Sequence, residues 1–131
     1  MSRGMIHHVE VNVSDLPKSL SFWDWLLTHL GYEPYQEWEQ GKSYRLGSSY
    51  LVFVQTEEEF LTPSYHRKRT GLNHLAFYGD SQEHVDELTR LLREKRIPIL
   101  YEKEHPYAGG EHYYAVFFED PDRIKVEVVS P

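Results

Sequence analysis

Two histidines and one glutamate occupy matching positions in segments that alternate between apolar and polar residues. His8 lies in MIHHVEVNV, His74 in LNHLAFYGD and Glu127 in IKVEVVS. Imidazole nitrogens and carboxylate oxygens together bind divalent cations such as Fe²⁺, Mn²⁺, Ni²⁺ or Zn²⁺, and three such ligands leave positions open for water or a chelating substrate. The three residues therefore predict a metal site. The alternative is that each is an ordinary hydrogen-bonded or solvated side chain.

The strand that contains His8 also contains a second histidine. In residues 5–13, Val9 and Val11 have one parity and His8 has the other. Successive side chains of a strand point to opposite faces, so only one of His7 and His8 can enter a given cavity. The parity selects His8.

The other two segments show the same alternation. Leu75 and Phe77 are opposite in parity to His74, and Val126 is opposite to Glu127. Helices must cover the apolar face of each sheet. The three candidate ligands are therefore predicted to lie on the face that no helix covers.

The order of the elements repeats along the chain. Apolar residues at helical spacing predict helices within 14–31 and 81–96, the second beginning with a capping box of Asp80 and Glu83. Alternating segments predict strands at 5–13, 32–38, 42–47, 50–55, 72–80, 98–103, 112–119 and 124–130. The sequence thus predicts an α+β protein in which one βαβββ module occurs twice.

Length and composition limit the possible functions. The chain has 131 residues, no cysteine and a net charge of −7. The missing cysteine excludes disulfides, thiolate metal sites and a cysteine nucleophile. The acidic balance disfavours nucleic acids and anionic membranes, and no apolar run approaches the roughly 20 residues that span a bilayer. We expect one cytoplasmic domain, with modules at about 5–56 and 72–130 joined by a linker at about 57–71.

Three motifs carry a resemblance to a known family. The segments IHHVEVNVSDLPKSLSFW, GLNHLAF and FFEDPDRIKVEVV resemble the vicinal oxygen chelate superfamily, which includes glyoxalase I, bleomycin and fosfomycin resistance proteins and extradiol dioxygenases. The resemblance covers nearly the whole chain. It implies that the two βαβββ modules form an incomplete barrel around a concave cavity, that His8, His74 and Glu127 bind the metal, and that the protein is a homodimer.

The resemblance also implies a function. Members chelate a small, oxygen-rich substrate on a divalent cation, which predicts a lyase, isomerase, dioxygenase or thiol transferase; the sequence selects neither the reaction nor the metal among Fe, Mn, Ni and Zn. One alternative is a metal-free protein that sequesters a small molecule, as bleomycin resistance proteins do. Another is a regulatory or interaction domain that has kept the cavity.

Two positions depart from the family pattern. Placing LVFV over KVEV puts Phe53 opposite Glu127, where glyoxalase-I-like members carry a carboxylate ligand. A phenyl ring cannot bind a metal, so glyoxalase I activity is not expected, and Gln55 on the same face is a weaker oxygen donor. Arg123 replaces the glycine that is usual in the DPDG turn, which predicts strain if φ is positive there.

Residues near the predicted ligands supply further candidates. The glycines of AGGEHYY suit a mobile loop ahead of His112 and Tyr114, which we predict to orient or protonate the substrate; the alternative is an ordinary hairpin. Lys125 shares the parity of Glu127 and is predicted to attract an anionic substrate; the alternative is a solvated strand end. Tyr78 shares the parity of His74 and completes the predicted pocket lining with Phe53, Gln55 and Lys125.

Overall fold

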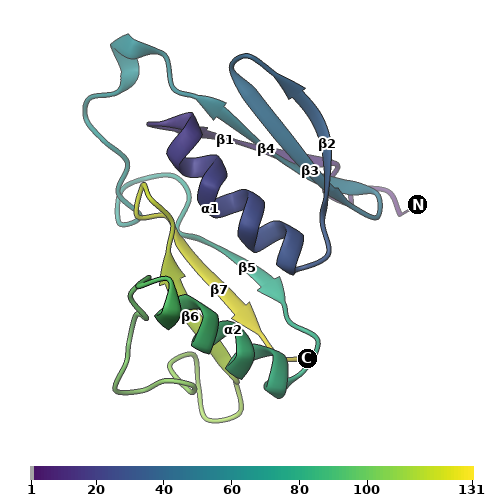
Figure 1. The fold of residues 1–131 in the computed structure, drawn as a ribbon, viewed down its shortest axis with the longest axis vertical. Coiled ribbons are helices and arrows are strands. Elements are labelled where there is room, and N and C mark those ends of the chain that lie inside the picture. Colours follow the sequence, from purple (N-terminus) through teal and green to yellow (C-terminus); the bar gives the residue numbers. More distant parts are fainter. Residues whose placement is uncertain (1) are drawn as a thin grey trace. The chain divides into compact units, whose positions relative to one another are not determined.

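The computed structural model describes residues 2–131, which divide after Ser64 into two compact units. Each unit consists of one sheet and one long helix, as Figure 1 shows. The α+β class and the repetition of this combination are as predicted. No helix among residues 2–131 is long and apolar enough to span a bilayer.

The first unit contains the complete predicted module. Its elements are β1 (His8–Val13), α1 (Leu16–His29), β2 (Glu33–Trp38), β3 (Gly41–Leu46) and β4 (Ser49–Gln55), with a short 3-10 helix, η1 (Glu58–Phe60), in the predicted linker. The strand order is β1-β4-β3-β2. Strand β1 runs parallel to β4, and the other neighbours are antiparallel.

The second unit has three strands where four were predicted. Its elements are β5 (His74–Tyr78), α2 (Gln82–Glu94), β6 (Ala115–Glu119) and β7 (Lys125–Val129), in the order β5-β7-β6. The predicted strand at 98–103 is wrong, because Ile99 makes a single bridge to Phe118. Tyr101 then adopts a left-handed φ of 57°, and its carbonyl accepts hydrogen bonds from two following backbone amides, which turns the chain out of the extended conformation.

Both α-helices begin at a side-chain cap. Asp15 accepts a hydrogen bond from the backbone amide of Lys18 at the start of α1. The predicted capping box of α2 is wrong, because Ser81 is the cap. Its extended backbone lets the hydroxyl accept a bond from the His84 amide at 3.0 Å.

The core of the first unit lies between α1 and its sheet. Trp23 of α1 stacks on Phe53 of β4, with ring centroids 4.7 Å apart, and both side chains are fully buried. Val13 and Leu26 are also fully buried. Phe53 therefore faces the helix, and its predicted place in the pocket lining is wrong.

The strand registers explain this error. In β1 and β4, Glu10 pairs with Val52 and Val11 with Phe53, whereas in β5 and β7, Ala76 pairs with Glu127. Since His8 corresponds to His74, Glu10 corresponds to Ala76, and the counterpart of Glu127 is Val52. The sequence alignment was displaced by one residue, and one residue moves a side chain to the other face of a sheet.

Candidate functional site

His74 and Glu127 come together on adjacent strands of the second unit. The two residues lie on the parallel neighbours β5 and β7. His74 Nε2 is 2.9 Å from Glu127 Oε1, and the glutamate is only 3% exposed. Val126 and Val128, which alternate with the glutamate, are fully buried on the other face. The prediction that His74 and Glu127 share a face is confirmed.

Tyr113 holds the second oxygen of this carboxylate. Its hydroxyl donates a hydrogen bond of 2.5 Å to Glu127 Oε2. That bond, with a smaller contribution from burial, raises the pKa of Tyr113 to about 12, so the phenol keeps its proton at neutral pH. Both oxygens of the buried carboxylate therefore have a partner on the protein.

Sequence reasoning selected Tyr114 and missed Tyr113. In the register of β6, Phe117 is paired with Glu127, and Tyr113 has the same parity as Phe117. Tyr114 has the opposite parity, and its hydroxyl donates a bond of 2.5 Å to Asp86 of α2. Tyr114 is thus held at Asp86, and its predicted role of orienting or protonating the substrate stays a prediction. Tyr114 has the same parity as Val116 and Phe118, which indicates that it lies on the face opposite Glu127. The sequence AVFFE is apolar on both faces, so this parity could not be recognised from the sequence.

His112 stays a prediction. It is exposed in the turn that precedes β6, one residue before Tyr113. The structure gives no hydrogen bond or ion pair for its ring that would bring it to the His74 and Glu127 pair.

A pocket of about 540 Å³ opens beside the pair. Its lining comes from β5, β6, β7 and the loop between α2 and β6, and consists of His74, Tyr101, Glu104, Ala108, Gly109, Tyr113, Phe117, Lys125 and Glu127. Gly109 lies directly beneath the Tyr113 ring: a Cβ added there would be 2.4 Å from Tyr113 Cδ1. The loop glycine is therefore needed for close approach to this ring.

Lys125 lines the same pocket, and its parity with Glu127 is as predicted. Its ammonium group donates a hydrogen bond of 3.0 Å to the Tyr101 hydroxyl. It lies 5.0 Å from the centroid of the Tyr101 ring and 5.3 Å from that of Phe117. No carboxylate of residues 2–131 forms a salt bridge with it.

His8 belongs to the first unit and is exposed at the start of β1. Its ring stacks on Tyr50 with centroids 4.7 Å apart and an interplanar angle of 3°. Its Nδ1 is 2.9 Å from His7 Nδ1. Within neither unit do the described residues gather three or more histidine, aspartate or glutamate side chains that could hold a metal ion. The role of His8 as a ligand stays a prediction.

Gln55 and Tyr78, two other predicted pocket residues, have different surroundings. The Gln55 amide accepts a hydrogen bond of 2.8 Å from the Leu16 amide and donates one of 2.9 Å to the Ser14 carbonyl. It lines a separate pocket of about 710 Å³ in the first unit. Its oxygen is thus engaged at the start of α1.

Tyr78 is 81% exposed at the end of β5 and close enough to Tyr113 to affect the pKa of that tyrosine.

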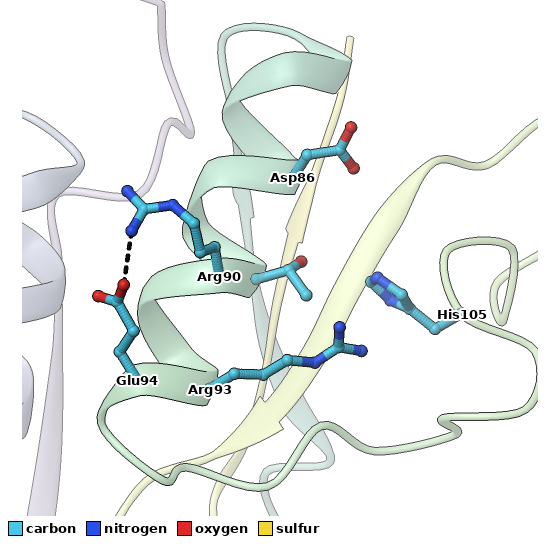
Figure 2. Close-up of a pocket in the computed structure, with 6 residues that line it drawn as sticks. Asp86, Arg90, Arg93, Glu94 and His105 are labelled. Atoms are coloured by element: carbon cyan, nitrogen blue, oxygen red, sulfur yellow. Dashed lines mark hydrogen bonds and ion pairs between the residues drawn. The ribbon is translucent and has the colours of Figure 1, made fainter.

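A further concavity lies between α2 and the loop that follows it. Its lining consists of Asp86, Thr89, Arg90, Arg93, Glu94 and His105, and Figure 2 labels all of them except Thr89. Arg90 pairs with Glu94 at 2.7 Å, and Arg93 pairs with Glu102. Burial lowers the pKa of His105 below its ordinary value. Because both guanidinium groups are paired with carboxylates, this concavity offers no unpaired positive charge.

Comparisons with known proteins agree on one family. Residues 5–128 match the Glyoxalase/Bleomycin resistance protein/Dioxygenase superfamily. The uncharacterised protein YqjT of Bacillus subtilis (strain 168) is 54% identical over 126 residues, which are 96% of this chain and 98% of that protein. The crystal structure of a candidate glyoxalase from Bacillus halodurans is 65% identical, with a TM-score of 0.97 over 98% of this chain and 97% of that one.

More distant structures share the fold alone. A mutant of the fosfomycin resistance protein FosX from Listeria monocytogenes, solved with Mn(II) and 1S,2S-dihydroxypropylphosphonic acid, is 18% identical, with a TM-score of 0.67 over 98% of this chain and 93% of that one. The two-module architecture predicted from the sequence is therefore that of the matching structures.

Proposed function

Because the chain belongs to the glyoxalase/bleomycin resistance protein/dioxygenase superfamily, we propose that it is a divalent-metal-dependent enzyme of the vicinal oxygen chelate type. His74 and Glu127 supply two of the metal ligands. His8, the counterpart of His74 in the first unit, supplies the third. The substrate is a small molecule that binds the metal through two neighbouring oxygens.

The hydrogen bonding of the His74 ring carries this proposal. Asn73 Oδ1 lies 2.7 Å from Nδ1, and Glu127 Oε1 lies 2.9 Å from Nε2. An imidazole that binds a metal is neutral, and a neutral imidazole has one proton and satisfies only one of these two oxygens. A divalent cation held by His74 and Glu127 would satisfy the other and would leave the ring proton on Nδ1 for Asn73, which is the usual partner arrangement of a metal-bound histidine.

The geometry of the pair fits the same donor set. Two ligand atoms at right angles, each about 2.1 Å from an ion, are about 3.0 Å apart. The 2.9 Å between His74 Nε2 and Glu127 Oε1 is close to this value. Tyr113 occupies the other carboxylate oxygen, so Glu127 presents a single oxygen toward His74.

The residues of the pocket have distinct tasks in this proposal. A bound divalent cation supplies a Lewis acid that polarises a carbonyl or stabilises negative charge on a substrate oxygen. Glu127 is withdrawn from water, which strengthens its electrostatic interactions. Tyr113 keeps its proton and orients the carboxylate. His112 remains our candidate for proton transfer, and the reaction, whether of a lyase, isomerase, dioxygenase or thiol transferase, is open.

Metal titration tests the proposal. Protein stripped of metal is titrated with Mn²⁺, and free Mn²⁺ is measured by electron paramagnetic resonance. We expect one equivalent to bind, His74→Ala and Glu127→Gln to abolish binding, and His8→Ala to weaken it at least tenfold. His7→Ala is the matched control, because it removes the adjacent histidine and should leave the affinity unchanged.

Two outcomes contradict the proposal. Binding of Mn²⁺ that survives both His74→Ala and Glu127→Gln places the metal elsewhere. Failure of Mn²⁺, Fe²⁺, Ni²⁺ and Zn²⁺ to bind at all favours the metal-free, sequestering alternative.

The proposal also includes a cytoplasmic homodimer. Sedimentation equilibrium measures whether the protein is a dimer.

A further inference from the structure

Lys125 places an unpaired positive charge in the pocket of an otherwise acidic chain. The chain has a net charge of −7. Lys125 lies on the same strand face as Glu127, two residues away, which corresponds to about 6.8 Å along the strand. It is also the direct cross-strand neighbour of His74. A small molecule bound at His74 and Glu127 would therefore lie close to the Lys125 ammonium group.

Two aromatic side chains, Tyr101 and Phe117, hold the lysine in place. Tyr101 and Phe117 pack edge to face with centroids 5.5 Å apart, and the ammonium lies near both rings. The hydroxyl of Tyr101 accepts one of its three N–H groups. Ring faces and a neutral hydroxyl attract the cation without cancelling its charge. Two N–H groups remain for a ligand.

The charge of the pocket changes sign when a cation binds. Its charged lining consists of Lys125, the exposed Glu104 and the buried Glu127. Two carboxylates and one ammonium leave the empty pocket with one negative charge. With a divalent cation bound, the pocket would carry one positive charge. The loaded pocket therefore attracts anions, and Glu104 is the group that opposes them.

We infer that Lys125 recognises an anionic substituent, a carboxylate or phosphonate, on a substrate that chelates the metal through two other oxygens. This inference rests on the proposed function and adds to it the charge of the substrate. The aromatic side chains of Tyr101, Tyr113 and Phe117 that line the same pocket fit a flat, unsaturated body between the two polar ends.

A matched pair of chelators tests the inference. Both 3,4-dihydroxybenzoate and its methyl ester chelate through the same vicinal hydroxyls, but only the acid carries an additional anionic group. Isothermal titration of Mn²⁺-loaded protein measures the dissociation constant of each. We expect the acid to bind about tenfold more tightly, as one charge-assisted hydrogen bond allows. Lys125→Met should remove the difference, Lys125→Arg should keep part of it, and Glu104→Gln should increase it.

The possible outcomes distinguish a failure of the Lys125 inference from a failure of the proposed metal site. Equal affinities for acid and ester, on protein shown to hold Mn²⁺, overturn the inference and leave the metal site intact. A preference for the acid that persists in Lys125→Met overturns it as well. If Mn²⁺ does not bind to the wild type, the proposed function fails and the inference fails with it.

Discussion

The adjacent tyrosines Tyr113 and Tyr114 make a matched experiment on what burial does to a hydrogen bond. Each hydroxyl donates to a carboxylate at 2.5 Å. Glu127, the acceptor of Tyr113, is 3% exposed, whereas Asp86, the acceptor of Tyr114, is exposed on α2. Replacing either tyrosine by phenylalanine removes one hydroxyl and leaves the ring. The two variants therefore differ in whether water can replace the lost donor.

The expected costs follow from that difference. Tyr113→Phe leaves a buried carboxylate with His74 as its remaining partner, and a hydrogen bond to a buried charge contributes about 1.5–3 kcal/mol. Tyr113 itself is 37% exposed, so we take the lower end and expect the free energy of unfolding to fall by about 1.5 kcal/mol. In Tyr114→Phe, water can replace the lost hydroxyl at the exposed Asp86 carboxylate. The free energy of unfolding should therefore fall by about 0.5 kcal/mol or less.

Urea unfolding measures both costs, with two probes because the chain has two compact units. All three tryptophans, Trp23, Trp25 and Trp38, lie in the first unit, so their fluorescence reports on that unit, while far-ultraviolet circular dichroism reports on both. The tyrosine variants should shift the dichroism transition. A Tyr114→Phe cost equal to or larger than that of Tyr113→Phe would refute the reasoning from burial.

Three further predictions each concern one residue: Gly109, Arg123 or Tyr114. Gly109→Ala places a Cβ 2.4 Å from Tyr113 Cδ1, so it should displace the Tyr113 ring and weaken Mn²⁺ binding. In a Tyr113→Ala background the same substitution should leave the Mn²⁺ affinity unchanged, and Mn²⁺ titration measures both effects. Arg123 has a φ of 67°, so Arg123→Gly should be about 1 kcal/mol more stable to urea than Arg123→Ala, and equal stabilities would contradict the assigned strain. The bond to Asp86 raises the pKa of Tyr114 to about 12, so its contribution to stability is complete below pH 10 and is lost as the pH rises through 12. Absorbance at 295 nm should show one late-ionising phenol fewer in Tyr114→Phe, and an unchanged late phase would contradict it.

The alternation of apolar residues predicted much of this structure correctly, because a strand with one buried face displays its parity directly. His74 and Glu127 were placed on one face on this basis, opposite Val126 and Val128. The argument fails where both faces are apolar. In AVFFE every residue except the last is buried, so parity could not decide between the tyrosines that precede the strand.

The missing strand at 98–103 has a different cause. ILY has the composition of a strand, and Ile99 does reach Phe118. The turn at Tyr101 depends on contacts made far along the chain: its hydroxyl meets Lys125 and its ring meets Phe117. Local propensity does not contain such contacts, because they exist only after the loop has packed against the sheet.

The two halves of the chain repeat in topology but not in chemistry. By register, Val52 stands at the counterpart of Glu127, and Tyr50 stands at the counterpart of Lys125. The first half therefore offers one candidate ligand, His8, supported by a stacked tyrosine ring, while the second offers a histidine, a buried carboxylate and a cation. A repeat alignment that is wrong by one residue hides this asymmetry, since it exchanges Val52 for the core residue Phe53. A carboxylate added at position 52 would lie on the face of His8, whereas at position 53 it would be buried against Trp23 without a partner.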